Sequence, residues 1–182
     1  ISPQEVYAGS SLKMYARYVV LRNLIAPVKA RSKLSKYGSK NDGGYVLPEV
    51  VVSDSRHMVS GGIENNNDFE IALAEEGLTG IQVDNSIEIP PLQHKNLEFI
   101  RATITDKVGN GNITLDELIA RSPCKDVILK LDIEGSEYKA LLGVSMETWS
   151  FLKAIVLELH NLDFLFYDVK AKFIIETLTR LV

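Results

Sequence analysis

The stretch from residue 126 to residue 143, DVILKLDIEGSEYKALLG, constrains the fold more than any other part of the chain. An apolar run, Val127 to Leu131, ends in a cluster of acids formed by Asp132, Glu134 and Glu137, and a helical pattern follows at once. In open α/β sheets, strands that end in polar residues and turn into helices form ligand sites at their carboxyl ends. The stretch therefore predicts a buried strand, a site at its end and a helix behind it.

The acids of this stretch differ in how easily they are explained. A charge buried away from water is costly unless it is paired, so a carboxylate on an apolar strand needs a specific reason. We interpret Glu137 as a solvated residue of the first helical turn, where the helix dipole favours an acid. This interpretation explains Asp132 poorly, because Asp132 still belongs to the apolar strand. Asp132 is therefore the first candidate for a site residue.

Composition narrows the class of protein. The chain has 182 residues, 46% of them hydrophobic, which suits one globular domain with a substantial core. The net charge of −4 and the lack of a basic stripe argue against nucleic-acid binding. A single cysteine, Cys124, excludes an intramolecular disulfide. No apolar run reaches the length of a membrane span and no signal peptide is evident, so we expect a cytoplasmic protein.

Apolar runs typical of strands alternate along the chain with helical patterns. We expect strands at residues 57–60, 80–84, 97–101, 126–132 and 153–159. We expect helices at residues 3–26, 68–76, 114–121, 137–143 and 169–181. This alternation predicts βαβ units in a Rossmann-like, doubly wound and mostly parallel sheet. We divide the chain into an N-terminal helical segment, residues 1–35, and an α/β domain, residues 36–182.

Local patterns refine these predictions. Asn67 with Glu70, and Thr114 with Glu117, have the spacing of a capping box at a helix start. Residues 37–48 predict a turn followed by a short strand. Residues 29–40, which overlap the start of this range, are mildly basic and are interpreted as a solvated linker. His57 and His94 are expected to be ordinary surface or edge residues.

The end of the first central strand carries a glycine turn, Ser60-Gly61-Gly62, shortly before a predicted helix. Glycines let a backbone approach a ligand closely, and a helix N-terminus offers free N–H groups. The second strand ends in Asp84, about 20 residues past the turn, which is the usual spacing of an acid that binds ribose hydroxyls. Glycines and acid together favour an adenosine-type ligand.

A second polar group ends the strand at residues 153–159, where Glu158 and His160 stand in the sequence IVLELHNLDF. If this strand neighbours the one that ends at Asp132, the three side chains converge. Histidine is the side chain best suited to proton transfer near neutral pH, so we favour His160 as a base. The same trio could instead hold a divalent cation, or His160 could only stabilise the strand end.

The motifs resemble those of a known family. LKLDIEGSEYKALLG followed by LKAIVLELH is similar to the FkbM-type S-adenosylmethionine-dependent methyltransferases, which carry a Lys-hydrophobic-Asp-hydrophobic-Glu-Gly-x-Glu motif. ITLDELI, residues 113–119, resembles the helix upstream of that motif, and residues 38–45 resemble a GxxxDGGY segment before the first strand. The resemblance extends over residues 36–160. It implies a class I methyltransferase fold and S-adenosylmethionine as cofactor.

By this resemblance, the cofactor-binding residues take defined places. Ser60, Gly61 and Gly62 would hold the methionine part, and Asp84 the ribose. The adenine would lie near Thr103 and Ile104, and Asp132 would face the methyl-donor end. Two departures from the family pattern are evident: the first turn lacks GxG, and the chain ends before the last two strands such a sheet should have. A longer protein or a reduced sheet is therefore expected.

The resemblance implies methyl transfer to a hydroxyl, since no Asn-Pro-Pro-Tyr of amino-directed enzymes follows the fourth strand. We expect a small acceptor such as a sugar, with Asp42 and Tyr45 on the acceptor side. His160 would be the base, with Asp132 and Glu158 orienting it or binding a metal.

Two alternative functions remain open: that of a nicotinamide-dependent oxidoreductase on a Rossmann sheet, and that of a degenerate methyltransferase domain that acts as a scaffold. The sequence leaves the oligomeric state open.

Overall fold

A computed structural model of the protein describes residues 3–109, 111–162 and 168–181. The chain forms two compact units. One contains helices α1 (Pro3–Leu24) and α7 (Asp168–Thr179), which contact each other, and the other spans Ala30–His160. Both helices were predicted from the sequence and are confirmed, whereas the division at residue 35 stays a prediction. Among the described residues, none of the helices combines the length and apolar character that a membrane crossing requires.

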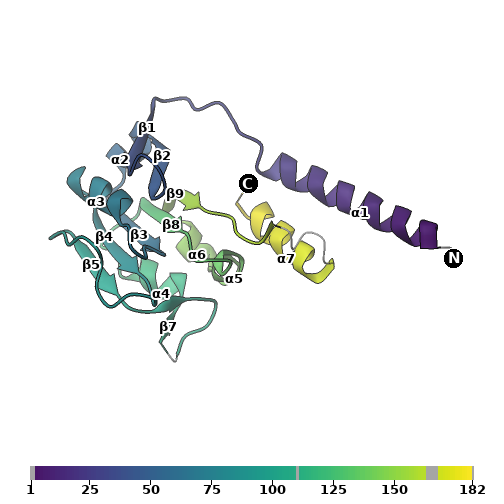
Figure 1. Ribbon diagram of the computed structural model, residues 1–182. Coiled ribbons are helices and arrows are strands. Elements are labelled where there is room, and N and C mark those ends of the chain that lie inside the picture. Colours follow the sequence, from purple (N-terminus) through teal and green to yellow (C-terminus); the bar gives the residue numbers. More distant parts are fainter. Residues whose placement is uncertain (1–2, 110, 163–167, 182) are drawn as a thin grey trace. The chain divides into compact units, whose positions relative to one another are not determined.

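The core of the larger unit is a sheet of five parallel strands in the order β5-β4-β3-β8-β9 (Figure 1). These strands are β3 (His57–Gly61), β4 (Thr79–Val83), β5 (Leu97–Ile100), β8 (Val127–Leu131) and β9 (Leu152–Leu157). Each coincides with a strand predicted from the sequence to within two residues at either end. The parallel Rossmann-like sheet is therefore confirmed. Its outer strands are β5 and β9.

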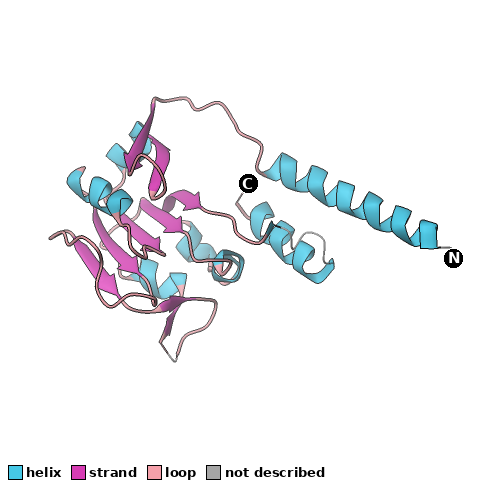
Figure 2. Cartoon of the chain, viewed as in Figure 1, coloured by secondary structure: helices cyan, strands magenta, loops and turns pink. Residues whose placement is uncertain are grey.

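Helices connect and cover the strands of this sheet (Figure 2). They are α2 (Glu49–Asp54), α3 (Asp68–Glu75), α4 (Leu115–Ala120), α5 (Glu137–Leu142) and α6 (Met146–Trp149). Two short strands that follow β5 along the chain, β6 (Thr103–Ile104) and β7 (Asn112–Ile113), pair in parallel with each other. All three predicted helices of this unit, at residues 68–76, 114–121 and 137–143, are present.

An antiparallel hairpin precedes the sheet, formed by β1 (Leu34–Gly38) and β2 (Gly44–Pro48). The turn and short strand predicted within residues 37–48 are present, but β1 lies within residues 29–40, and the interpretation of these residues as a solvated linker was wrong for 34–38. β1 pairs with β2 along its whole length, Tyr37 opposite Tyr45, and both tyrosines pack on the apolar cluster around Phe69.

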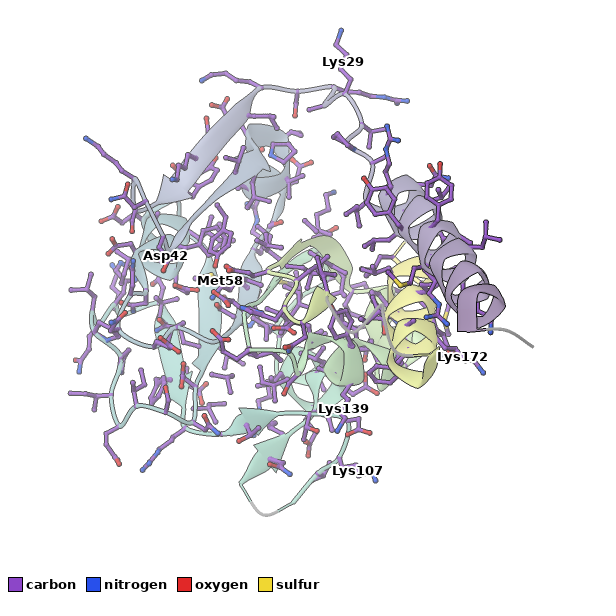
Figure 3. The ribbon with its side chains drawn as sticks, turned by 45° about the vertical axis from the view of Figure 1, so that its right-hand side comes forward. Lys29, Asp42, Met58, Lys107, Lys139 and Lys172 are labelled. Atoms are coloured by element: carbon purple, nitrogen blue, oxygen red, sulfur yellow. The ribbon has the colours of Figure 1, made fainter. Side chains whose placement is uncertain are left out.

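Apolar side chains fill both faces of the sheet, as expected when helices cover a parallel sheet on two sides. Val59 and Leu129 face the cluster that includes α4 and α5, and their neighbours Met58 and Ile128 face the cluster that includes α3. All residues of β3 and β8 are buried. Figure 3 shows Met58 among packed side chains, whereas Lys139 extends outward. The central strands therefore form a rigid support for the loops that follow them.

The register of the parallel strands aligns their carboxyl ends. Gly61 lies opposite both Val83 and Leu131, and Leu131 lies opposite Leu157. The ladder continues for one more residue: the Asp132 N–H donates to the Gly61 carbonyl at 3.1 Å, and the Glu158 N–H to the Leu131 carbonyl at 3.0 Å. The residues that immediately follow the four strands are therefore neighbours on one edge of the sheet: Gly62, Asp84, Asp132 and Glu158.

The two predicted capping boxes have different outcomes. Thr114 and Glu117 form the complete reciprocal box at the start of α4. Asn67 is at the N-cap position of α3, but its side chain makes no capping bond; the Asn67 amide donates instead to Gln82 Oε1 at 2.8 Å. Glu70 is buried and accepts from the Ser60 hydroxyl. The prediction of a capping box there was wrong, because polar groups of the sheet beneath α3 take both side chains.

The protein is expected to lose stability when any side chain is added at Gly62, the residue that follows β3. Gly62 has a φ of +76°, and a Cβ there would collide with the carbonyl oxygen of Asp132. We predict that Gly62→Ala lowers the free energy of unfolding by about 3 kcal/mol, combining left-handed strain with overpacking. Urea unfolding followed by the fluorescence of Trp149, the only tryptophan, measures the change.

Gly77 is the matched control. Its φ is +98°, but nothing lies within 4 Å of a Cβ placed there. Gly77→Ala should therefore show only the strain, about 1–2 kcal/mol. Equal losses for the two variants would contradict the close approach of Gly62 to Asp132.

Candidate active site

Two cavities open at the carboxyl edge of the sheet. Cavity I has a volume of about 330 Å³ and lies over the ends of β3, β4 and β8. Cavity II is smaller, about 110 Å³, and lies between the β1–β2 turn and the ends of β8 and β9. The two share part of their lining: Gly62, Glu64, Asp132 and Glu134. A site with two adjoining compartments can hold two ligands next to each other.

Asp84 organises the wall of cavity I. Its Oδ2 accepts the backbone N–H groups of Ile63 and Glu64, both at 2.9 Å, and its Oδ1 accepts the N–H and hydroxyl of Ser86 at 2.7 and 2.6 Å. Burial alone would raise the pKa of Asp84, but these hydrogen bonds outweigh it and hold the pKa below its ordinary value. The carboxylate therefore stays ionised and fixes the loop after β3.

The rest of cavity I combines apolar and polar surface. Val83, Ile104 and Ile133 contribute apolar walls, while Asn85 and Thr103 contribute polar groups. The Asn85 amide donates to Thr103 Oγ1 at 2.6 Å, which joins the loop after β4 to β6. The cavity volume lies within the range of small-molecule sites, and such sites are mostly apolar with a few placed polar groups. Cavity I is therefore large enough for a small organic ligand.

The glycine turn after β3 contributes one residue to the cavities. Gly62 lines both, whereas Ser60 and Gly61 line neither. Ser60 is fully buried and donates to Glu70, and Gly61 packs against the side chain of Ile104. Gly62 and Glu64, with φ of +76° and +39°, place this turn in the left-handed region, and such backbone is often concentrated at functional sites.

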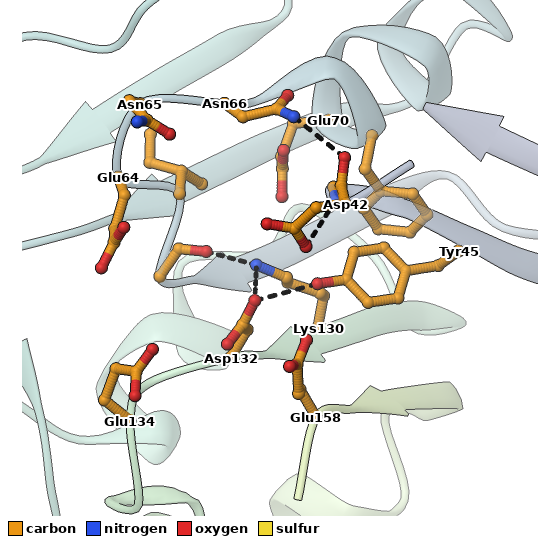
Figure 4. Close-up of a pocket in the computed structure, with 14 residues that line it drawn as sticks. Asp42, Tyr45, Glu64, Asn65, Asn66, Glu70, Lys130, Asp132, Glu134 and Glu158 are labelled. Carbon is orange, nitrogen blue, oxygen red and sulfur yellow. Dashed lines mark hydrogen bonds and ion pairs between the residues drawn. The ribbon is translucent and has the colours of Figure 1, made fainter. Parts of the chain in front are cut away.

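Three side chains converge at the base of cavity II (Figure 4). The Tyr45 hydroxyl donates to Asp132 Oδ2 at 3.0 Å. The Lys130 ammonium lies 3.6 Å from the same oxygen, donates to the Gly62 carbonyl and lies over the Tyr45 ring. Burial, followed by the charge of Asp132, raises the pKa of Tyr45, so this phenol remains a hydrogen-bond donor throughout the physiological pH range.

The β1–β2 turn closes one side of cavity II. Asp42 and Gly43 of this turn line the cavity together with Tyr45. The turn is attached to the loop after β3, because the Asn66 amide donates to Ser39 Oγ at 3.0 Å and to the Asp42 carbonyl at 3.1 Å. The segment thus forms both a tight hairpin turn and a wall of the cavity.

His160 lies close to the carboxylates at the other side of cavity II. Its Nε2 is 3.6 Å from Glu134 Oε2, 3.7 Å from Asp132 Oδ1 and 3.9 Å from Glu158 Oε1. The three acids line cavity II, whereas His160 lines neither cavity directly. The imidazole is partly exposed and lies next to the acids at the cavity edge.

Glu137 differs most from its predicted environment. Its side chain is completely buried, and Oε1 accepts the N–H groups of Ile133 at 2.9 Å and Gly135 at 3.2 Å. The same oxygen is 3.0 Å from His160 Nδ1. The interpretation as a solvated helix residue was wrong, because the turn after β8 folds back and its N–H groups enclose the carboxylate.

The charges around His160 influence one another. Burial alone would lower the pKa of His160, but the hydrogen bond and charge of Glu137, together with Glu134 and Asp132, raise it above its ordinary value. The Asp132 carboxylate is the main cause of a raised pKa at Glu158. Asp132, Glu158 and His160 each offer an atom within 4.8 Å of the others, so these residues could hold a divalent cation.

Sequence reasoning missed several buried polar residues near this site. Lys130 stands in an apolar strand two positions before Asp132, and the alternation of side chains along a strand places both on one face. That spacing could have identified Lys130. Glu70 had no such signal, because its partner Ser60 is ten residues away on another element. At the opposite end of β3, a central strand, His57 is also buried, with Nδ1 bonded to Thr79, so the expectation of a surface or edge residue was wrong.

The fold and the two cavities define a class of protein. A parallel α/β sheet with a glycine turn after its first central strand, and an acid after the next, is typical of nucleotide-dependent enzymes, among them the class I methyltransferases. The family model described as "Methyltransferase FkbM domain" matches residues 65–181, more than half of the chain.

The chain belongs to the FkbM methyltransferase family, as its motifs predicted, and this membership supports a methyltransferase. No curated protein and no solved structure matches the chain closely enough to be counted as a relative.

The hydrogen bonds of Asp84 lead to a pH-dependent prediction. Because its pKa is lowered in the folded protein, Asp84 stabilises the fold above its ordinary pKa near 3.9, and this contribution is lost as pH falls through the folded value. We expect Asp84→Asn to reduce the free energy of unfolding at pH 7 by about 2 kcal/mol, since an amide cannot accept all four bonds. The loss should shrink in acid.

Asp116→Asn is the control, because among the described residues the Asp116 carboxylate accepts a single hydrogen bond, from the exposed N–H of Ser145. It should change stability by less than about 1 kcal/mol at either pH. Urea unfolding of both variants at pH 7 and pH 3 provides the comparison. A loss for Asp84→Asn that is independent of pH would contradict the ionised network.

Proposed function

We propose that the protein is an S-adenosylmethionine-dependent methyltransferase that acts on a hydroxyl of a small, uncharged acceptor such as a sugar. The observation that carries the proposal is the pair of adjoining cavities at one sheet edge, with Gly62, Glu64, Asp132 and Glu134 common to both. A donor in cavity I and an acceptor in cavity II would meet at these shared residues. Alignment of two reactants in this way is worth about 7–11 kcal/mol of the barrier.

Cavity I is the proposed cofactor site. Asp84 would bind the ribose; its four lone-pair positions are engaged, so a ribose hydroxyl would replace the bond from the Ser86 hydroxyl, which can rotate away. Thr103 and Ile104 would lie near the adenine. Gly62 is the residue of the glycine turn best placed for the methionine part, with Ser60 and Gly61 supporting it from beneath. When bound, the cofactor supplies an activated methyl group on a sulfonium.

Cavity II is the proposed acceptor site, and its charge supports an uncharged polyol. Acids line it on several sides: Asp42, Glu64, Glu70, Asp132, Glu134 and Glu158. Lys130 is the single basic residue in this lining, and its ammonium is buried beside Asp132 and the Gly62 carbonyl. Sugar hydroxyls can donate to carboxylates, whereas a phosphate or carboxylate on the acceptor would be repelled. Asp42 and Tyr45 would contact this acceptor.

His160 is the proposed base for the acceptor proton. An ordinary carboxylate binds a proton only near pH 4, whereas an imidazole does so near neutral pH, so His160 is the strongest base next to the cavity acids. Asp132 and Glu158 would orient it and stabilise the imidazolium. The proton would leave the acceptor hydroxyl and be held on His160 Nε2, the nitrogen that faces these acids.

Calorimetry tests the cofactor assignment. We expect S-adenosylhomocysteine to bind with a dissociation constant in the micromolar range, about −8 kcal/mol, and NAD to show no binding. The glycine turn and Asp84 are common to both cofactor classes, but the remaining motifs are those of a methyltransferase. Binding of NAD alone would instead favour an oxidoreductase, and binding of neither would favour a scaffold role.

Kinetics test the base. We expect His160→Gln to lower kcat for transfer of labelled methyl groups to a panel of monosaccharides by about 10²–10⁴-fold, with little change in affinity for S-adenosylhomocysteine. Monosaccharide phosphates should react more slowly than the parent sugars. His94→Gln is the control and should keep full activity. Loss of wild-type activity in EDTA, restored by Mg²⁺, would instead favour the alternative in which Asp132, Glu158 and His160 hold a metal.

A further inference from the structure

Glu137 occupies a position that its sequence context does not explain. It lies in the first turn of α5, yet its side chain has no exposed surface. Its Oε1 accepts two backbone N–H groups from the turn after β8, and its Oε2 has no hydrogen-bond partner among the described residues. Because burying a carboxylate is costly, such a side chain needs a partner of opposite charge or a strong donor. The partner is His160, with Nδ1 at 3.0 Å from Oε1.

This hydrogen bond decides which ring nitrogen of His160 carries the proton. A carboxylate accepts hydrogen bonds but cannot donate them, so the nitrogen that faces Glu137 must be the N–H. In the neutral imidazole the other nitrogen, Nε2, then carries the lone pair. Nε2 is the atom that lies within 4 Å of the acids lining cavity II: Asp132, Glu134 and Glu158.

The backbone of His160 is held separately from its ring. The Tyr138 hydroxyl, one residue after Glu137, donates to the His160 carbonyl at 2.7 Å. Two neighbouring residues of α5 therefore hold one histidine, Tyr138 through its main chain and Glu137 through its imidazole. The first bond fixes where the residue lies, and the second fixes the orientation and tautomer of the ring.

We propose that Glu137 is a positioning residue that holds His160 as the Nδ1–H tautomer, so that the Nε2 lone pair faces cavity II. The inference rests on the proposed function, in which His160 Nε2 accepts the acceptor proton. A buried carboxylate that holds the imidazole in the reactive tautomer is how hydrolytic triads orient their histidine. Glu137 itself lines neither cavity, so it acts only through His160.

Nuclear magnetic resonance of ¹⁵N-histidine-labelled protein tests the inference directly. The chain has three histidines, and His160→Gln assigns the relevant signals. Spectra are recorded at alkaline pH, where the imidazole is neutral. We expect Nδ1 of His160 to show the shift of a protonated nitrogen and Nε2 that of an unprotonated one. In Glu137→Leu this pattern should be lost, because no acceptor remains for Nδ1–H.

Two further variants separate positioning from folding. Glu137→Gln keeps an amide oxygen where Oε1 lies, so it should retain the Nδ1–H tautomer. Glu117→Leu is the matched control: Glu117 also stands in a first helical turn and accepts a backbone N–H, but it caps α4 away from His160. It should lose stability without any change in the His160 signals. Methyl transfer should fall about 10–100-fold in Glu137→Leu, mainly in kcat.

Each outcome of these experiments either supports or overturns the inference. An Nε2–H tautomer in the wild-type protein, or an unchanged His160 pattern in folded Glu137→Leu, overturns the inference. Near-ultraviolet circular dichroism shows whether that variant is folded; if it is not, the Glu137→Gln spectrum decides, and loss of the Nδ1–H pattern there also overturns it. Tautomer spectra need no cofactor, so failure of this inference and failure of S-adenosylhomocysteine binding are seen independently.

Discussion

The contacts of the buried Lys130 ammonium hold together the carboxyl edge of the sheet, where the cavities lie. Lys130 lies on a strand that is buried along its whole length, yet it bridges the Gly62 carbonyl of one strand end and the Asp132 carboxylate of its own. Its charge also opposes the effect of burial on Glu70, whose pKa is raised chiefly by desolvation. Without this cation, the pKa values of Glu70 and Glu158 would be raised further, because the charge of Lys130 lowers both.

Around this point the polar residues form two layers. Ser60, Gln82 and Lys130 lie in register across three neighbouring strands, and the first turn of α3 covers them with Asn67 and Glu70. One residue further along the strands, the ends carry the groups that line the cavities. The inner layer is hydrogen-bonded within the protein and supports the outer layer, and two of its members, Glu70 and Lys130, also reach the wall of cavity II.

Much of this architecture could be predicted from local patterns. The five strands, the helices between them and the alignment of Asp84, Asp132 and Glu158 all follow from apolar periodicity and from the rule that parallel strands end on one edge. Glu137 and Glu70 could not be assigned in this way. Both stand at ordinary first-turn positions for an acid, and only the packing of distant elements on them shows that they are buried.

The order of apolar and polar residues along the chain determines the parallel sheet and which residues follow each strand, because side-chain periodicity depends on near neighbours alone. The direction of the His160 ring, the charge pairing of Lys130 and the separation of two cavities depend on contacts between residues 20 to 90 positions apart. Such contacts are decided by how the helices and the β1–β2 hairpin pack on the sheet. The tertiary structure therefore decides which of the many acids are buried supports and which line a cavity.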